Sequence, residues 1–297
     1  MPSLKELRGR IAGVKNTRKI TSAMKMVAAS KLRRAQTHAE ASRPYAEAMR
    51  RMMSELAAAT KGQGDAPTLL GGTGEDRVHL LVAVTSDRGL AGGFNANVAR
   101  MTRQVIARLQ GEGKTVKLLT VGRKGADQLG RTYADILVDR LPGTAGRDVE
   151  FGTASGLGER LVSMFEKGEF DHCTLIYNSF VNAMTQTPVE RQLIPLPAPE
   201  GANDNEDARA SDAPQYDFEP DEGTLLARLL PRNLQMQIYA ALLESAAGEQ
   251  GARMTAMDNA SRNASKAIDQ LSQRYNRSRQ ANITNELIEI ISGAEAV

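Results

Sequence analysis

Residues 4–36 read LKELRGRIAGVKNTRKITSAMKMVAASKLRRAQ, and their spacing decides the architecture. Leu4, Leu7, Ile11 and Val14 recur at alternating steps of three and four, which is the seam of a coiled coil. Pro44 interrupts the later pattern only as a tolerated kink. The pattern predicts one helix over residues 1–60, whose stripe continues through Ile20, Met24, Val27, Leu32, Ala35, Ala39, Ala46, Met49, Met53 and Leu56.

The C-terminal segment also has apolar or small residues at helical spacing. No proline occurs between Leu234 and Ile291, although Gly248 and Gly251 each weaken a helix by about 1 kcal/mol relative to alanine. At about 1.5 Å per residue, two such helices are too long for a globule of roughly 19 Å radius of gyration. We therefore expect residues 225–297 to pack against residues 1–60 as an antiparallel coiled coil, through Tyr239, Leu242, Ala246, Met254, Met257, Ala260, Ala264, Ile268, Leu271 and Tyr275.

The middle of the chain alternates strand-like and helix-like segments. Residues 78–85 (VHLLVAVT) and 115–121 are strand-like, and residues 95–109 between them have helical periodicity. Two further strand-like runs cover residues 173–180 and 189–194. This alternation predicts a small Rossmann-like α/β domain over 77–196 with a mainly parallel sheet, after a linker at 61–76. The fold class expected for the chain is α/β, or α+β when the terminal coiled coil is included.

Charge is strongly segregated although the net charge of the 297 residues is only +3. Residues 1–60 carry 13 Lys and Arg against 4 Asp and Glu, whereas residues 196–224 carry 1 against 9. The Pro- and Asp-rich composition of 197–224 predicts an acidic loop. The basic arm alone is also typical of a mitochondrial presequence or of a nucleic-acid-binding arm. Both alternatives are disfavoured because the helical pattern continues beyond residue 36.

No catalytic or metal site is indicated. The single cysteine, Cys173, excludes an internal disulfide and a cysteine-based zinc site, and its place in a strand predicts a buried side chain. Residues 86–95 (SDRGLAGGFN) have the spacing G-x-x-G-G, which predicts a structural turn rather than a dinucleotide-binding loop. Residues 111–115 (GEGKT) precede a strand instead of following one, which favours a surface turn. We expect no catalytic residue, no bound cofactor and no metal on this chain.

The two ends carry a family resemblance. Residues 20–32 (ITSAMKMVAASKL) and 275–287 (YNRSRQANITNEL), together with 291–294 (ISGA), strongly resemble the terminal signatures of the γ subunits of F-type ATP synthases. Residues 86–95 and 252–257 match further stretches of that family. Departures are Ala91 and Gly248, where members often have cysteine and serine, and a long acidic segment without the cysteine pair of plastid relatives.

The resemblance implies a proton-transporting rotary complex. In that family the terminal helices form a shaft inside an α3β3 head, and the α/β domain lies at its foot against the ε subunit and the membrane c-ring. ATP, ADP and Mg²⁺ bind to the α and β subunits. The implied contacts with the head involve Met24, Lys25, Lys31, Arg33, Arg34, Arg253, Gln280, Thr284 and Glu286; those at the foot involve Asp87, Arg88, Tyr216 and Phe218.

The implied location is peripheral, on the cytoplasmic face of a bacterial inner membrane, with no direct membrane insertion. A similarity that begins almost at Met1 leads us to expect no cleaved presequence. The alternative is a coiled-coil protein that binds nucleic acid or acts as a scaffold. It explains the basic arm but not the C-terminal signature.

The glycine-rich segments generate the first prediction. Because neither fits a phosphate-binding loop, the isolated chain should bind no nucleotide tightly. Calorimetric titration with Mg–ATP measures this directly. A stoichiometric site of micromolar affinity would contradict the interpretation of both segments as turns.

Overall fold

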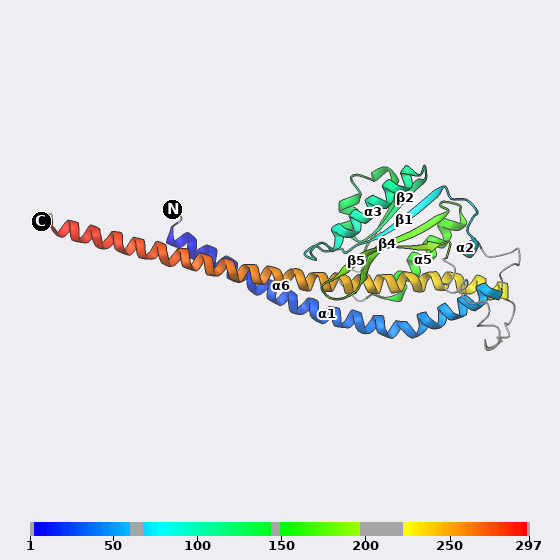
Figure 1. Cartoon of the computed structure of the whole chain (residues 1–297), viewed down its shortest axis with the longest axis horizontal. Helices are drawn as coiled ribbons and strands as arrows, with labels where there is room; N and C mark the ends of the chain where they lie inside the picture. Colours follow the sequence, from blue (N-terminus) through cyan, green and yellow to red (C-terminus); the bar gives the residue numbers. More distant parts are fainter. Residues whose placement is uncertain (1–2, 60–67, 144–148, 197–221, 296–297) are drawn as a thin grey trace. The chain divides into compact units, whose positions relative to one another are not determined.

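The computed structural model describes residues 3–59, 68–143, 149–196 and 222–295 (Figure 1). The chain divides into two compact units, Met1–Ser30 with Arg253–Val297 and Lys31–Ala252. Two long helices, α1 (Leu4–Ala59) and α6 (Glu222–Glu295), contribute to both units. The predicted combination of long terminal helices with an α/β domain between them is confirmed.

A five-stranded sheet forms the centre of the second unit. Its strands are β1 (Val78–Val84), β2 (Thr115–Val121), β3 (Leu137–Leu141), β4 (His172–Phe180) and β5 (Gln186–Ile194). Their order is β3-β2-β1-β4-β5, in which β5 alone is antiparallel to its neighbour. The continuous apolar run of β1 suits a central strand that is covered on both faces. The predicted, mainly parallel sheet is confirmed.

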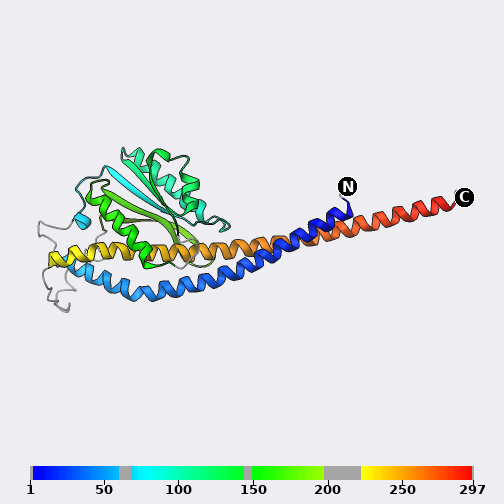
Figure 2. The same cartoon turned by 180° about the vertical axis from the view of Figure 1, so that it is seen from behind.

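The two faces of the sheet support separate cores. Leu80 and Val82 pack with α5 (Phe151–Glu166) and α6, whereas Leu81 and Ala83 pack with α3 (Phe94–Gly111). Both views show α3 on the opposite side of the sheet from α5 (Figures 1 and 2). Cys173 lies in the first core, fully buried as predicted, and burial raises the pKa of its thiol.

Several element boundaries differ from the sequence expectations. Strand β3 and helix α5 were not predicted, and neither were the short helices α2 (Thr68–Gly71), α4 (Arg123–Leu129) and the 3₁₀ turn Ala134–Ile136. Helix α2 falls inside the expected linker 61–76. Helix α6 begins at Glu222, inside the expected loop 197–224, and continues through Pro231. The remainder of that loop lies outside the described residues.

Gly248 and Gly251 allow the sheet to approach α6 closely. A Cβ on Gly248 would lie 3.3 Å from side-chain atoms of Phe94 and Gln186. A Cβ on Gly251 would lie 3.1 Å from the carbonyl oxygen of Ala183, in the turn between β4 and β5. The helix propensity lost at these glycines is thus offset by packing.

Gly122 generates a stability prediction. Its φ is +96°, and an added Cβ would lie 2.1 Å from the carbonyl oxygen of Thr85. Gly122→Ala should therefore lower the free energy of unfolding by more than about 3 kcal/mol, through strain and overlap together. Gly113 is the matched control, because its φ is +77° but no atom lies within 4 Å of its added Cβ. Gly113→Ala should cost only about 1–2 kcal/mol in urea unfolding. Equal losses for the two variants would contradict the argument.

Candidate functional site

The first unit is an antiparallel pair formed by the start of α1 and the end of α6. Lys25 Nζ donates to Asp258 Oδ1 at 2.6 Å, and Arg8 Nη2 donates to the Tyr275 hydroxyl at 2.9 Å. The two contacts have the same spacing along both helices, so the register is constant between them. The buried seam comprises Leu7, Thr21, Ala28, Met257, Ala264 and Ile268. This confirms the predicted pairing of the chain ends within the unit.

The predicted phase of the α1 seam is wrong in one stretch. Ile20 and Val27 were assigned to the seam, but they are 60% and 57% exposed. Seven-residue steps from Val14 fall instead on Thr21 and Ala28, which are buried. Thr21 is compatible with burial because its hydroxyl donates to the carbonyl oxygen of Thr17 at 3.0 Å. The exposed apolar side chains therefore lie on the outer face of α1.

Lys25, a candidate head contact, already has a partner in its own chain. Asp258 accepts from Lys25 through Oδ1 and from Arg262 Nη2 through Oδ2 at 2.8 Å. The hydrogen bond from Lys25 is the largest cause that lowers the pKa of Asp258, with Arg262 contributing in the same direction. A lowered carboxyl pKa keeps the pair intact at neutral pH; the pair is lost only as the pH falls through that lowered value.

The other candidates on α1 and α6 occupy different environments. Met24 and Lys31 are half-buried, whereas Arg33 and Arg34 are exposed. Arg253 is only 9% exposed, which assigns its side chain to the packing of the chain rather than to an open contact surface. Gln280, Thr284 and Glu286 are exposed on the last turns of α6.

The end of α6, which was expected to pack with residues 1–60, carries an apolar stripe beyond the predicted seam residues. The constant register places Leu4, the first residue of α1, opposite Arg279. Beyond that point all side chains from 281 to 292 are exposed. Ile283, Leu287, Ile290 and Ile291 recur there at helical spacing and are 50–71% exposed. Comparing the helix lengths before assigning partners would have revealed this overhang.

Of the two foot candidates among the described residues, Arg88 has an exposed side chain and Asp87 does not. Asp87 is buried, and its Oδ1 accepts the backbone N–H groups of Arg123 and Gly143, each at 3.0 Å. This corrects the expectation of a surface contact at Asp87, because its carboxylate ties together the loops that follow three neighbouring strands. Tyr216 and Phe218 lie outside the described residues.

The two glycine-rich segments are structural turns. The Asn95 side chain accepts from the backbone N–H of Ser86 at 2.9 Å, which closes the first turn internally. In the second turn, Gly113 adopts φ +77° and Lys114 forms an ion pair with Asp76. The predicted turns are confirmed at both segments.

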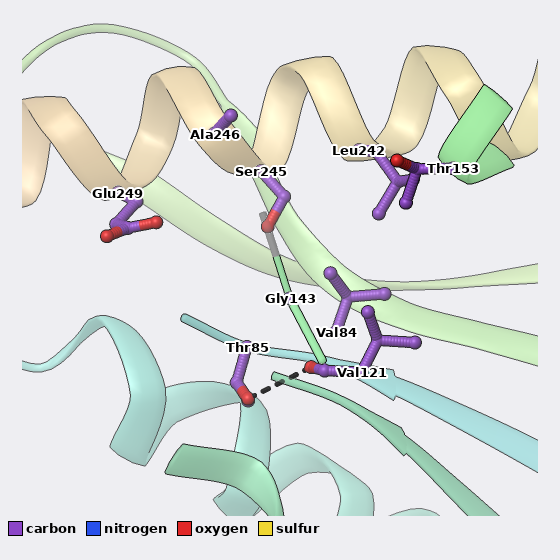
Figure 3. A pocket seen from close by; sticks show the side chains of 9 residues that line it. All are labelled: Val84, Thr85, Val121, Gly143, Thr153, Leu242, Ser245, Ala246 and Glu249. Atoms are coloured by element: carbon purple, nitrogen blue, oxygen red, sulfur yellow. Dashed lines mark hydrogen bonds between the residues drawn. The ribbon is translucent and has the colours of Figure 1, made fainter. Parts of the chain in front are cut away.

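A small cavity lies where the carboxyl ends of β1 and β2 meet α6 (Figure 3). Ser245 and Glu249 point from α6 toward Thr85, whose hydroxyl donates to the carbonyl oxygen of Val121 at 3.1 Å. The volume of about 20 Å³ accommodates one water molecule and is far too small for a nucleotide.

Within the described ranges, no three His, Cys, Asp or Glu side chains are grouped in a way that suits a metal ion. None of the helices in those ranges combines the length and apolar character required to cross a bilayer.

Comparisons with known proteins agree on one family. A profile of the family described as ATP synthase matches residues 3–297. The ATP synthase gamma chain of Gluconobacter oxydans (strain 621H) is 68% identical, with all of both chains aligned. The central stalk of Tetrahymena thermophila mitochondrial ATP synthase is 29% identical, with a TM-score of 0.62 over 82% of this chain and 99% of that one. A Euglena gracilis ATP synthase structure, 19% identical, shares the fold with a TM-score of 0.68 over 99% of this chain and 94% of that one.

The buried seam predicts a contrast between two aspartate substitutions. Ile268→Asp places a charge among buried side chains and should destabilise the helix pair by about 2–5 kcal/mol. Leu287→Asp changes an exposed side chain and should leave the pair intact. Amide hydrogen exchange of residues 4–30 measures the difference. Unchanged protection in the Ile268 variant would show that the seam is wrongly assigned.

Proposed function

The chain belongs to the ATP synthase gamma-chain family, and we propose that it is the central shaft that couples proton flow to ATP synthesis. As a subunit of that complex it turns with the membrane rotor, and its asymmetry drives the catalytic sites of the head through successive conformations. Sequence identity of 68% to a gamma chain, over the whole length of both chains, favours this function over the nucleic-acid-binding or scaffold alternative.

The observation that carries the proposal is the overhang of α6. Five isoleucine or leucine side chains, the four of the stripe and Ile288, protrude from a single helix that has no α1 partner at that level. Burying such a side chain is worth about 1.5–3 kcal/mol, which favours insertion into an apolar socket of a partner. Apolar contact is also non-directional, so a socket of this kind holds a helix without fixing its angle.

The proposed partners are the α3β3 head, the ε subunit and the c-ring. The head would contact Met24, Lys31, Arg33, Arg34, Gln280, Thr284 and Glu286, and it would pass Lys25 while that residue is paired within the chain. Arg88 and the segment containing Tyr216 and Phe218 would serve the foot. The exposed apolar side chains Ile20, Met26 and Val27 support a partner at the level of Met24. The similar Tetrahymena structure is of a central stalk and c-ring, which supports the foot partner.

In this proposal the chain holds no catalytic residue and no cofactor, and ATP, ADP and Mg²⁺ bind to the α and β subunits. The internally closed turn at Ser86 and the water-sized cavity support that division of roles. The chain would lie at the cytoplasmic face of a bacterial inner membrane, held there by its partners rather than by insertion. Nucleic acid is not among the proposed partners.

Rotation can be tested with a single thiol label. Because Cys173 is fully buried, an exposed cysteine introduced as Glu112→Cys would be the site labelled by a maleimide probe. A bead attached there should rotate in one direction when the surface-bound α3β3 complex hydrolyses ATP. The unsubstituted chain is the control for label specificity. A stationary bead on an actively hydrolysing complex would contradict the proposal.

The head contact is tested at Met24. Met24→Lys adds a cation where acidic elements of the head are proposed to pass, which creates an ion pair that every turn must break. An interaction of roughly 1–3 kcal/mol changes a rate-limiting step by about five- to a hundredfold. The complex should assemble and hydrolyse ATP but pump protons poorly, while Met24→Gln, which is polar but uncharged, should stay coupled. Normal pumping by the lysine variant would refute a head contact at this residue.

A further inference from the structure

Lys25 differs from the other basic residues of the N-terminal arm in its surroundings. Residues 1–34 carry ten Lys and Arg against one acidic residue, Glu6. Between Ile20 and Ser30, however, Lys25 is the only charged residue. The neighbouring side chains Ile20, Met26 and Val27 are exposed and apolar. This stretch of α1 thus presents an apolar surface with a single cation in it.

That cation is held by a carboxylate of the opposite helix. Asp258 binds the Lys25 ammonium through one carboxylate oxygen and the Arg262 guanidinium through the other, at 2.6 and 2.8 Å. The Lys25 and Asp258 side chains are 45% and 30% exposed, so the pair faces solvent rather than a sealed core. Exposed pairs contribute little to folding stability. Stability alone is therefore a weak explanation for this geometry.

We propose that Asp258 is a positioning residue for coupling: it holds the Lys25 ammonium on the chain and so prevents a transient ion pair with carboxylates of the head. The inference rests on the proposed function, in which this level of the shaft turns past acidic elements. A released lysine has a flexible four-carbon stem and three donors, which suits it to capture a passing carboxylate. Such a charge-assisted contact would have to break at each step of rotation.

The test is Asp258→Asn in the assembled, membrane-bound complex. The substitution keeps the shape of the side chain and removes its charge. Proton pumping per ATP hydrolysed should fall by about two- to tenfold, since a modest added barrier changes a rate by this factor. Asp269→Asn is the matched control: Asp269 is exposed, lies three turns further on the same helix, and loses the same charge. This control should remain coupled.

A second pair of variants distinguishes the proposed role of Asp258, which is to keep Lys25 from pairing with the head (the guarding role), from simple stabilisation of the helix pair. Lys25→Gln and Asp258→Asn both abolish the Lys25–Asp258 ion pair, so a structural role of that pair predicts a coupling defect in each variant. The guarding role predicts that Lys25→Gln alone stays coupled, and that adding it to Asp258→Asn restores pumping. Raising the ionic strength should also relieve the Asp258→Asn defect, because salt screens exposed charges.

Two results would overturn the inference: normal pumping by Asp258→Asn, or failure of Lys25→Gln to restore it. Bead rotation distinguishes this failure from failure of the proposed function. If the bead turns and the Asp258 variant pumps normally, the guarding role alone is wrong. If the bead is stationary, both proposals are wrong.

Discussion

The seam between the first and last segments of the chain is the interaction on which its organisation depends. Residues 4–30 and 253–279 bury small and apolar side chains at heptad spacing, and neither segment can bury them alone. In the sequence, unit Lys31–Ala252 is therefore inserted between the two helical segments of one coiled coil. Because the two partners are far apart in the sequence, the coil forms only when both segments are present.

The periodicity of the sequence was sufficient to predict the long helices and the central strands, but not the exact phase of the seam. A stripe assigned from apolar residues alone passes through Ile20 and Val27. The seven-residue repeat of buried positions in the structure passes through Thr21 and Ala28. Hydrophobicity and register disagree at this point, since Ile20 and Val27 are apolar and yet exposed; in the proposed function they face a partner. The conflict is itself a sign of a functional surface.

The remaining misses have identifiable physical causes. Helix α5 contains Gly152, Gly156 and Gly158, which lower its local propensity, yet a Cβ on Gly158 would lie only 2.7 Å from the Gln235 side chain. Close packing against α6 thus requires a residue that local propensity disfavours. The partner of Lys25 lies 233 residues away, at Asp258. No local pattern predicts such a pair, and only the register of the folded coil brings the two residues together.

In the helix pair, one set of residues gives stability and a different set is exposed for contact with partners. One pair of helices can therefore serve as both a scaffold and a moving surface. The seam supplies stability through buried Leu7, Ala28 and Ile268, and the outer face makes little contribution to it. In the proposed function, contacts on that outer face form and break at every step, which requires them to be weak or independent of angle. Exposed apolar side chains meet this requirement because their attraction is non-directional. A bare ammonium would not meet it, because it would form a strong, short hydrogen bond with a carboxylate at one angle of rotation. In the inference drawn above, the pairing of Lys25 with Asp258 meets the same requirement.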